Sequence, residues 1–229
     1  AVVEERSNVQ PSAIVRFAQA VGFAGASPLQ PLMRDGLLQE DRSLGYAERI
    51  RQHRYAAPGE EEGPRELLSE FVKGNILALE NLNHSVGMRE LTEAIDLIEK
   101  ADTVYVAGFR RSFPVASYLT YMLAQADKRT VMVDGVGGLH LQQARGLRDG
   151  DVLVAISYAP YSPETIALVD AFAGRGAVIA ITDSVIGAIA KEHALVLQVR
   201  ESEVRGFRSL AASMCLAQSL AIGLASRKI

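Results

Sequence analysis

Apolar residues in the second half of the chain gather into five short runs that are almost uninterrupted by polar positions. These runs are Thr103–Ala107, Thr130–Val133, Val152–Ile156, Val178–Thr182 and Val196–Val199. Short, nearly continuous apolar runs rich in β-branched residues are typical of strands that are buried on both faces of a parallel sheet. The pattern therefore predicts five parallel strands.

Between these runs, apolar positions recur at the three- and four-residue spacing of helices. The predicted helices are Val115–Ala126, Leu139–Leu147, Pro163–Ala173, Gly187–His193 and a closing helix at Phe207–Ala225, after two helical patterns at Leu68–Leu82 and Met88–Ile98. Strands that alternate with helices form right-handed βαβ units. The predicted fold class is α/β, a three-layer α/β/α sandwich with a five-stranded parallel sheet.

A change of pattern divides the chain. Residues 57–64 read A-P-G-E-E-E-G-P, a helix-breaking and strongly solvated stretch that is typical of a linker. Residues 1–56 show short helical patterns and no strand pattern. We therefore predict a small all-α N-terminal domain at 1–56, a linker at 57–64 and the α/β domain at 65–229.

Composition and charge narrow the class of protein. The chain has 229 residues, of which 48% are hydrophobic and 22% charged, and its net charge is -3. This composition excludes disordered, collagen-like and coiled-coil chains. The single cysteine, Cys215, excludes an intrachain disulfide scaffold and suits a reducing compartment. Without a signal-peptide or membrane-span pattern, we expect a cytoplasmic protein with no membrane partner.

Ligands in open α/β sheets bind at the carboxyl ends of the strands, so the loop after Ala107 is a candidate site. Gly108 permits a tight turn there, and Ser112 is placed to cap the next helix. The free N–H groups of a helix start attract anions, and Arg110 and Arg111 add charge. The alternative is a capped helix with two surface arginines in salt bridges. No dinucleotide or P-loop glycine motif is present.

The loop after Ile156 is a second hydroxyl-rich turn. Ser157 and Ser162 flank backbone amides that can surround a phosphate, and Pro163 suits the first turn of a helix. The alternative is that Ser162 only caps this helix and that Ser157 bonds the local backbone. Two such loops on one sheet favour a phosphate pocket.

These segments carry a resemblance. V-Y-V-A-G-F-R-R-S, D-G-D-V-L-V-A-I-S-Y-A-P-Y-S-P-E-T and G-A-V-I-A-I-T-D-S resemble the sugar isomerase (SIS) domain, a phosphosugar-binding α/β sandwich. The resemblance implies that the serines of the two loops hold a phosphate and that an acid after the last strand holds sugar hydroxyls. The candidate effector-binding residues are Gly108, Arg110, Arg111, Ser112, Ser157, Tyr158, Ser162 and Glu201.

The second loop departs from the family pattern S-x-S-G-x-[TS]. Ala159 replaces the middle serine and Pro160 replaces the glycine, so a hydroxyl and a backbone N–H are lost as donors. In the first loop, Arg110 stands where the family often has a second glycine. We expect Arg110 and Arg111 to compensate with charge and forked donors.

The N-terminal block resembles the helix-turn-helix of RpiR-family transcriptional regulators through N-V-Q-P-S-A-I-V-R-F-A-Q-A-V-G-F-A-G, at Asn8–Gly25. The resemblance implies that the second helix enters the major groove, with Gln10, Ser12, Ala13 and Arg16 as DNA-binding candidates. We expect this domain to be a remnant, truncated at its N-terminus and weak in binding DNA. The alternative is a generic helical hairpin.

The combined pattern predicts a transcriptional regulator whose SIS domain binds a phosphosugar-like effector and modulates binding of operator DNA. We expect no enzyme activity, cofactor or metal. We expect a homodimer or homotetramer, and the resemblance implies that the C-terminal helix lies in the interface. One alternative is a sugar-phosphate aldose–ketose isomerase, for which Glu201, Glu203, His140 and His193 are the candidate acids and bases. Another is an assembly module.

Overall fold

The computed structural model describes residues 16, 50 and 63–228, and residues 63–228 all belong to one compact unit of the chain, Tyr46–Ile229. Three of the predicted DNA-binding residues, Gln10, Ser12 and Ala13, lie outside the described residues. Arg16 is helical and exposed. The domain boundaries at 56 and 64 and the helix-turn-helix therefore stay predictions.

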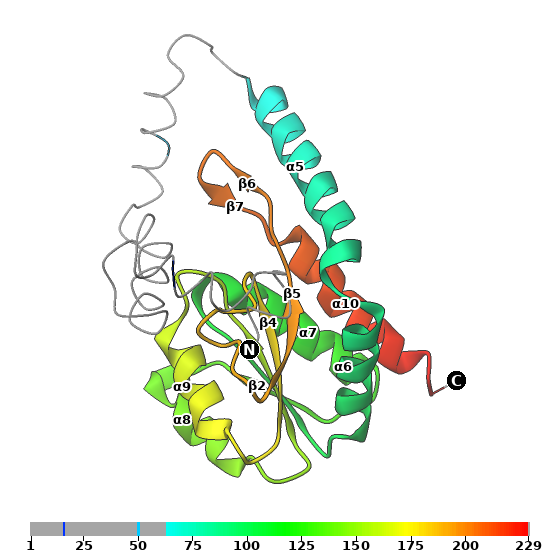
Figure 1. The fold of residues 1–229 in the computed structure, drawn as a ribbon, viewed down its shortest axis with the longest axis vertical. Coiled ribbons are helices and arrows are strands. Elements are labelled where there is room, and N and C mark those ends of the chain that lie inside the picture. Colours follow the sequence, from blue (N-terminus) through cyan, green and yellow to red (C-terminus); the bar gives the residue numbers. More distant parts are fainter. Residues whose placement is uncertain (1–15, 17–49, 51–62, 229) are drawn as a thin grey trace. The chain divides into compact units, whose positions relative to one another are not determined.

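Five parallel strands form the centre of the fold (Figure 1). The strands are β1 (Val104–Gly108), β2 (Thr130–Val133), β3 (Val152–Ile156), β4 (Ala177–Thr182) and β5 (Ala194–Gln198), in the order β2-β1-β3-β4-β5. All four pairings between neighbouring strands are parallel. The predicted fold class is confirmed, and each predicted strand lies within two residues of its observed position.

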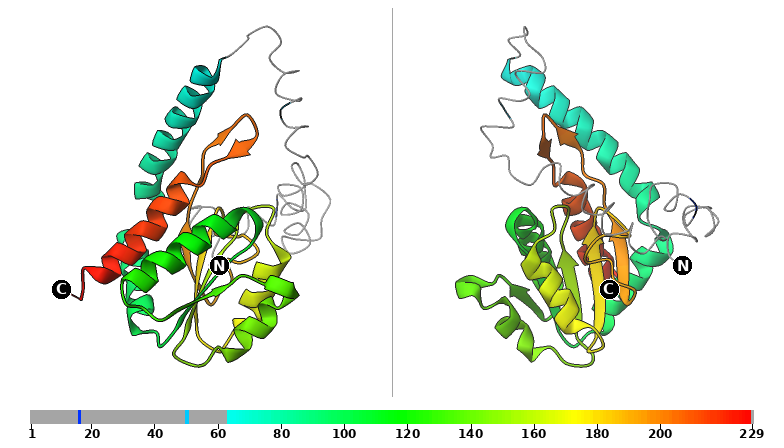
Figure 2. Two further views of the ribbon diagram at one scale, coloured as in Figure 1. Left: turned by 180° about the vertical axis from the view of Figure 1, so that it is seen from behind. Right: turned by 60° about the vertical axis from the view of Figure 1, so that its left-hand side comes forward.

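Helices cover both faces of the sheet (Figures 1 and 2). One face packs against α6 (Met88–Lys100), α7 (Phe113–Gln125) and α10 (Ala211–Ala225), and α5 (Pro64–Ser85) packs on α10. The other face packs against α9 (Pro163–Phe172) and the turn that follows α8 (His140–Gln143). Short 3-10 turns at Arg110–Ser112, Val136–Gly138 and Ala144–Gly146 complete the fold. Among the described helices, none is long and apolar enough to cross a membrane.

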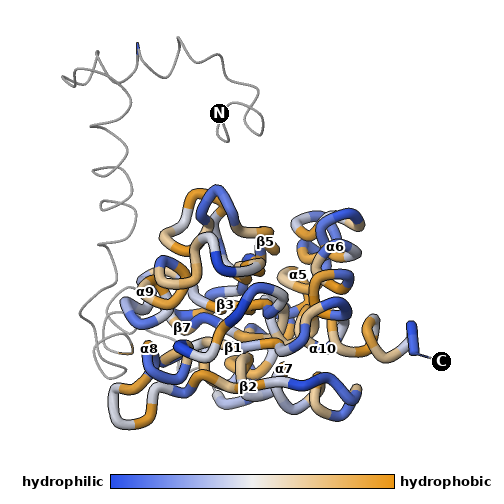
Figure 3. Tube along the Cα trace, turned by 90° about the horizontal axis from the view of Figure 1, so that it is seen from below, coloured by the Kyte–Doolittle hydropathy of each residue, from blue (hydrophilic) through white to orange (hydrophobic). Residues whose placement is uncertain are grey.

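The side chains of β1 show why the strands are apolar throughout. Val104 and Val106 lie in the core beneath α7 and α10, whereas Tyr105 and Ala107 lie in the core beneath α9 and the Ala144–Gly146 turn. Successive side chains of a strand point to opposite faces, so a strand covered on both faces needs apolar residues at every position. By contrast, α6 is covered on one side only, and polar and apolar residues alternate along its turns (Figure 3).

One predicted helix, Gly187–His193, is wrong. The segment consists of turns, closed by hydrogen bonds from Gly187 N–H to the Ser184 carbonyl and from Ala190 N–H to the Gly187 carbonyl. Ile189 is fully buried and holds the segment against the core. Its apolar residues therefore pack without a helix. His193 is an exposed turn residue before β5 and does not end a helix.

The predicted closing helix begins too early. Residues Phe207–Arg208 form strand β7, which pairs with β6 (Glu203–Val204) in an antiparallel hairpin, and α10 starts only at Ala211. The turn residues Arg205 and Gly206 both have positive φ, 54° and 75°. Arginine is not one of the residues that usually mark such a two-residue turn, which is why the pattern did not indicate the hairpin.

Candidate functional site

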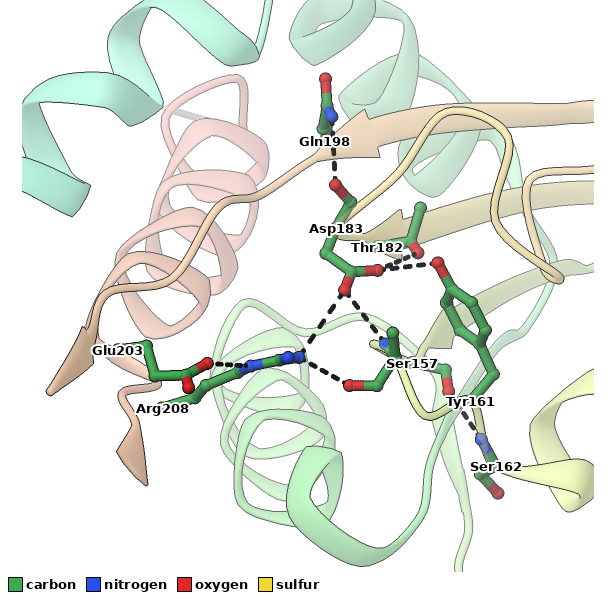
Figure 4. Close-up of polar contacts among 9 residues, drawn as sticks. Ser157, Tyr161, Ser162, Thr182, Asp183, Gln198, Glu203 and Arg208 are labelled. Carbon is green, nitrogen blue, oxygen red and sulfur yellow. Dashed lines mark hydrogen bonds and ion pairs between the residues drawn. The ribbon is translucent and has the colours of Figure 1, made fainter. Parts of the chain in front are cut away.

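The candidate site lies at the carboxyl edge of the sheet, where β1 and β3 are neighbours. The chain leaves β1 for β2 on one side and returns to β3 on the other, so this is the point where the strand order reverses. The loops after β1, β3 and β4 meet there, and the β6–β7 hairpin reaches them through Arg208 (Figure 4).

Gly108 is required by close packing at the end of β1. A Cβ atom on this residue would lie 2.9 Å from the Ala116 Cβ and 3.0 Å from the Ser112 carbonyl oxygen. The backbone then turns into α7 through Arg110, whose φ is 55°. Ser112 is buried at the start of α7, but its side chain makes no capping hydrogen bond, so its predicted capping role is wrong.

The two arginines of this loop differ in their surroundings. Arg110 is exposed and pairs with Glu164, with 3.7 Å between Nη2 and Oε1, as the salt-bridge alternative predicted. Arg111 turns inward, and its guanidinium lies 5.2 Å from the ring centroid of Tyr158. Two buried side-chain atoms have no hydrogen-bond partner among the described residues, and Arg111 Nη1 is one of them.

Burial and a second arginine outweigh the negative charges of Glu201 and Asp183 around Arg111. Burial lowers the pKa of its guanidinium, and the charge of Arg208 lowers it further. A buried charged donor that lacks an acceptor carries a large desolvation cost. An anion bound beside Nη1 would remove this cost.

Ser157 and Ser162 organise the loop after β3. Ser162 N–H donates to Ser157 Oγ at 3.1 Å, and Ser162 Oγ caps α9 by accepting from Thr165 N–H. Ser162 Oγ also donates to Glu164 Oε2, and this hydrogen bond lowers the pKa of that carboxyl. The capping alternative for Ser162 is thus confirmed, and its hydroxyl proton is already used.

Tyr158 and Glu201 form a buried relay on the α10 side of the site. Ser213 Oγ donates to Glu201 Oε1 at 2.6 Å, so the Tyr158 hydroxyl must donate to Ser213 Oγ. Glu201 also accepts from the backbone N–H groups of Ala212 and Ser213. The carboxylate of Glu201 therefore caps the N-terminus of α10. Burial raises the pKa of the Tyr158 hydroxyl, so this hydroxyl keeps its proton.

Asp183 and Arg208 are functional candidates that the sequence did not reveal. Asp183 accepts from Ala159 N–H at 3.0 Å and from the Tyr161 hydroxyl at 2.8 Å (Figure 4). Arg208 Nη1 donates to the Ala159 carbonyl at 2.6 Å and lies 3.9 Å from Asp183 Oδ2. The polar T-D-S turn after β4 was the one available signal for Asp183. No pattern indicated Arg208, because it falls within the predicted helix Phe207–Ala225, whereas the structure places it in β7.

The candidate isomerase bases are only partly gathered at this edge. His140 lies at the rim, with the centroid of its ring 6.0 Å from that of Phe109. Glu203 pairs with Arg208 Nε at 2.6 Å. Within the part of the chain that is described, no group of three His, Cys, Asp or Glu side chains is arranged to hold a metal ion.

Comparison with known proteins places this site in a family. The family model of the SIS domain matches residues 97–223, which is more than half of the chain. Among solved structures, the chain is similar to the sugar isomerase domain of the RpiR transcription factor from Sphaerobacter thermophilus. The identity is 25% and the TM-score 0.66, over 71% of this chain and 91% of that chain.

Two further structures share the fold. The Vibrio vulnificus NanR protein, complexed with ManNAc-6P, is 15% identical with a TM-score of 0.60, over 98% of this chain and 78% of that one. Phosphoheptose isomerase GmhA from Neisseria gonorrhoeae is 19% identical with a TM-score of 0.59, over 72% of this chain and 100% of that one. The family model covers more than half of the chain, and the solved structures share its fold: the chain belongs to the SIS domain family.

Proposed function

We propose that the chain is a transcriptional regulator of the RpiR type, whose SIS domain binds a phosphosugar-like effector and thereby modulates operator binding by an N-terminal helix-turn-helix. The observation that carries the effector site is the buried Nη1 of Arg111 at the carboxyl edge of the sheet, which has no hydrogen-bond partner within residues 63–228. Regulators with an SIS domain are among the similar structures, and one of them holds a sugar phosphate.

The anion would bind through arginine more than through the loop after β3. In that loop, the N–H of Ala159 donates to Asp183 and the N–H of Ser162 donates to Ser157, while Pro160 has no N–H. These amides are therefore not free to bind a phosphate. Ser157 keeps its hydroxyl proton as a donor, and Arg111 in the loop after β1 adds a charged one. The planar fork of Arg111 suits two oxygens of a phosphate at once.

A sensor suits the site better than an isomerase does. Aldose–ketose isomerisation needs a base that is free to take a proton from carbon. Glu201 accepts three hydrogen bonds from the start of α10, and Glu203 is paired with Arg208. The observation that favours the isomerase is His140 at the rim. Isomerisation is therefore the second candidate function, with His140 as the general base acting on an open-chain sugar phosphate.

One experiment tests both functions. Thermal unfolding is recorded with ManNAc-6P, arabinose 5-phosphate and inorganic phosphate, and NMR spectra of the same samples report conversion of the sugar. We expect at least one sugar phosphate to raise the Tm of the wild type and not that of Arg111→Ala, with no product formed. The matched control is Arg227→Ala, which removes an arginine paired with Asp96 and Glu99 far from these loops. Formation of an isomer would show an enzyme, and equal shifts in both variants would refute the Arg111 site.

A further inference from the structure

The β6–β7 hairpin stands between the candidate effector site and α5 (Figures 1 and 2). Each of its strands has only two residues, and its turn holds Arg205 in the left-handed region at φ 54°. A ladder this short does not hold a hairpin in place by backbone bonds alone. The position of the hairpin therefore depends on its side-chain anchors.

One set of anchors fixes the hairpin to α5. Arg205 donates from Nε and Nη2 to the two carboxylate oxygens of Glu70, at 2.8 and 2.7 Å. Ser202 Oγ donates to Asn75 Oδ1 at 2.9 Å. Between these contacts, a Cβ atom at Gly74 would lie 3.1 Å from a methyl group of Val204, so helix and hairpin are packed closely.

A second anchor fixes the same hairpin to the site. Arg208 donates a hydrogen bond from Nη1 to the Ala159 carbonyl and another from Nε to Glu203. Its Nη1 also lies within ion-pair distance of Asp183. Asp183 in turn holds the N–H of Ala159. Ala159 lies in the middle of the loop after β3. Its N–H is thus bonded to Asp183 and its carbonyl to Arg208, the two residues of the ion pair that holds the hairpin.

We propose that the β6–β7 hairpin couples the effector site to α5, with Arg208 as its contact on the site and Arg205 as its contact on the helix. The proposal rests on the proposed function and names the route of its regulation. Arg111 lies over the ring of Tyr158 and Arg208 binds the carbonyl of the next residue, Ala159, so an anion beside Arg111 competes with Asp183 and this carbonyl for Arg208. Arg208 then shifts toward the anion, and the hairpin moves with it.

The consequence at α5 follows from the bidentate pair. Arg205 and Glu70 are partly buried, and a two-pronged pair tolerates little displacement before both hydrogen bonds are lost. We therefore distinguish two states of α5, one in which Glu70 is bonded to Arg205 and one in which this pair is broken. The ligand shifts the balance between them because it binds one state more tightly than the other. Because α5 follows the predicted linker at 57–64, it is the element through which such a change would reach an N-terminal domain.

The coupling is tested first without a ligand, by hydrogen exchange of the α5 amides from Glu66 to Ile76. We expect Arg208→Ala to speed this exchange about threefold or more, because it releases the hairpin from the site. In an Arg205→Ala, Ser202→Ala background, the same change has less than about a 1.5-fold effect, because the hydrogen bonds that hold the hairpin to Glu70 and Asn75 are already lost. Arg227→Ala, which removes ion pairs to α6, leaves the exchange of these amides unchanged.

Additive effects of Arg208→Ala and the Arg205→Ala, Ser202→Ala background, or equal effects of Arg208→Ala and Arg227→Ala, would overturn the coupling. If an alanine variant does not fold, as judged by circular dichroism, Arg208→Gln takes the place of Arg208→Ala, and Glu70→Gln takes the place of Arg205→Ala.

A second arm uses ManNAc-6P and arabinose 5-phosphate as probes. We expect a probe that binds to change α5 exchange in the wild type, and to bind the Arg205→Ala, Ser202→Ala variant within about twofold of wild-type affinity without changing α5 exchange. A probe that still changes α5 exchange in this variant would overturn the coupling. If no probe binds, the proposed effector site fails, whereas the experiment without a ligand still decides the coupling.

Discussion

At the scale of single residues, the proposed anion site depends on Arg111. This arginine is held by the tight turn at Gly108 and stacked on Tyr158, and its Nη1 is buried without an acceptor among the described residues. A protein that needed only stability would gain from an apolar side chain of similar size here. The anion site proposed for this edge would account for the arginine.

This account predicts opposite effects of Arg111→Met on stability and on binding. The free energy of unfolding without ligand should rise by about 1 kcal/mol, because the desolvation of Arg111 and its repulsion by Arg208 outweigh its attraction to Glu201 and Asp183. Affinity for a bound sugar phosphate should fall about 10- to 100-fold, the worth of a charged hydrogen bond. Urea unfolding and calorimetric titration measure the two quantities. A loss of stability together with unchanged affinity would contradict the assignment.

Gly108 allows a second test at this scale. Gly108→Ala brings a methyl group against Ala116 and the Ser112 carbonyl, and the backbone contact cannot be relieved by a rotamer change. We expect a loss of about 2 kcal/mol in the free energy of unfolding, measured in urea. Ala116→Gly in the same chain should restore only part of it, because the carbonyl contact stays. Full restoration would show that the methyl of Ala116 alone sets the requirement.

At the scale of elements, α10 depends on a cap from outside the helix. Its first residues are Ala211 and Ala212, which offer no capping side chain, and the preceding Leu210 makes no side-chain cap. The carboxylate of Glu201, ten residues before the helix starts, fills this place. A negative charge at a helix N-terminus is favourable both as a hydrogen-bond acceptor and toward the helix dipole.

We therefore expect Glu201→Ala to lower the free energy of unfolding by about 1–2 kcal/mol. Glu201→Gln should lower it by less, since the amide oxygen still accepts while the charge is lost. The control is Glu203→Gln, which affects an exposed pair with Arg208 and should change stability by less than about 0.5 kcal/mol. Equal losses in the two glutamine variants would argue against the capping role.

At the scale of the whole molecule, the apolar surface indicates where subunits would meet. Leu216, Leu220 and Leu224 of α10 are buried within their own domain. In contrast, α5 exposes Leu68, Val72, Ile76 and Leu77, with Ile76 51% exposed. An apolar stripe of this kind on a surface helix is typical of an interface. For the proposed homodimer or homotetramer, α5 is therefore a better candidate contact than α10.

Sedimentation velocity tests this expectation with two substitutions of equal exposure. Ile76→Glu on α5 should reduce the mass of the oligomer, because it places a charge in the contact. Ile222→Glu on α10, at a side chain 50% exposed, should leave it unchanged. The reverse result would place the contact on α10, as the family resemblance implied.

The amino-acid pattern alone was sufficient to predict the sheet, the helices that contain most of the core and the two loops of the site. Strands such as Val152–Ile156 are buried on both faces and must be apolar at each position, so their local pattern is unambiguous. Glycine and proline positions, and a serine before Pro163, likewise act within a few residues of where they stand.

The roles of the polar side chains, in contrast, became visible only in the folded chain. Glu201 could equally have faced a sugar, and it caps α10 because the chain folds back over that helix. Arg208 reaches Ala159, 49 residues away in sequence, through a hairpin that no local pattern indicated. Such contacts depend on distances between segments that meet only after folding. A pattern of neighbouring residues carries no information about them.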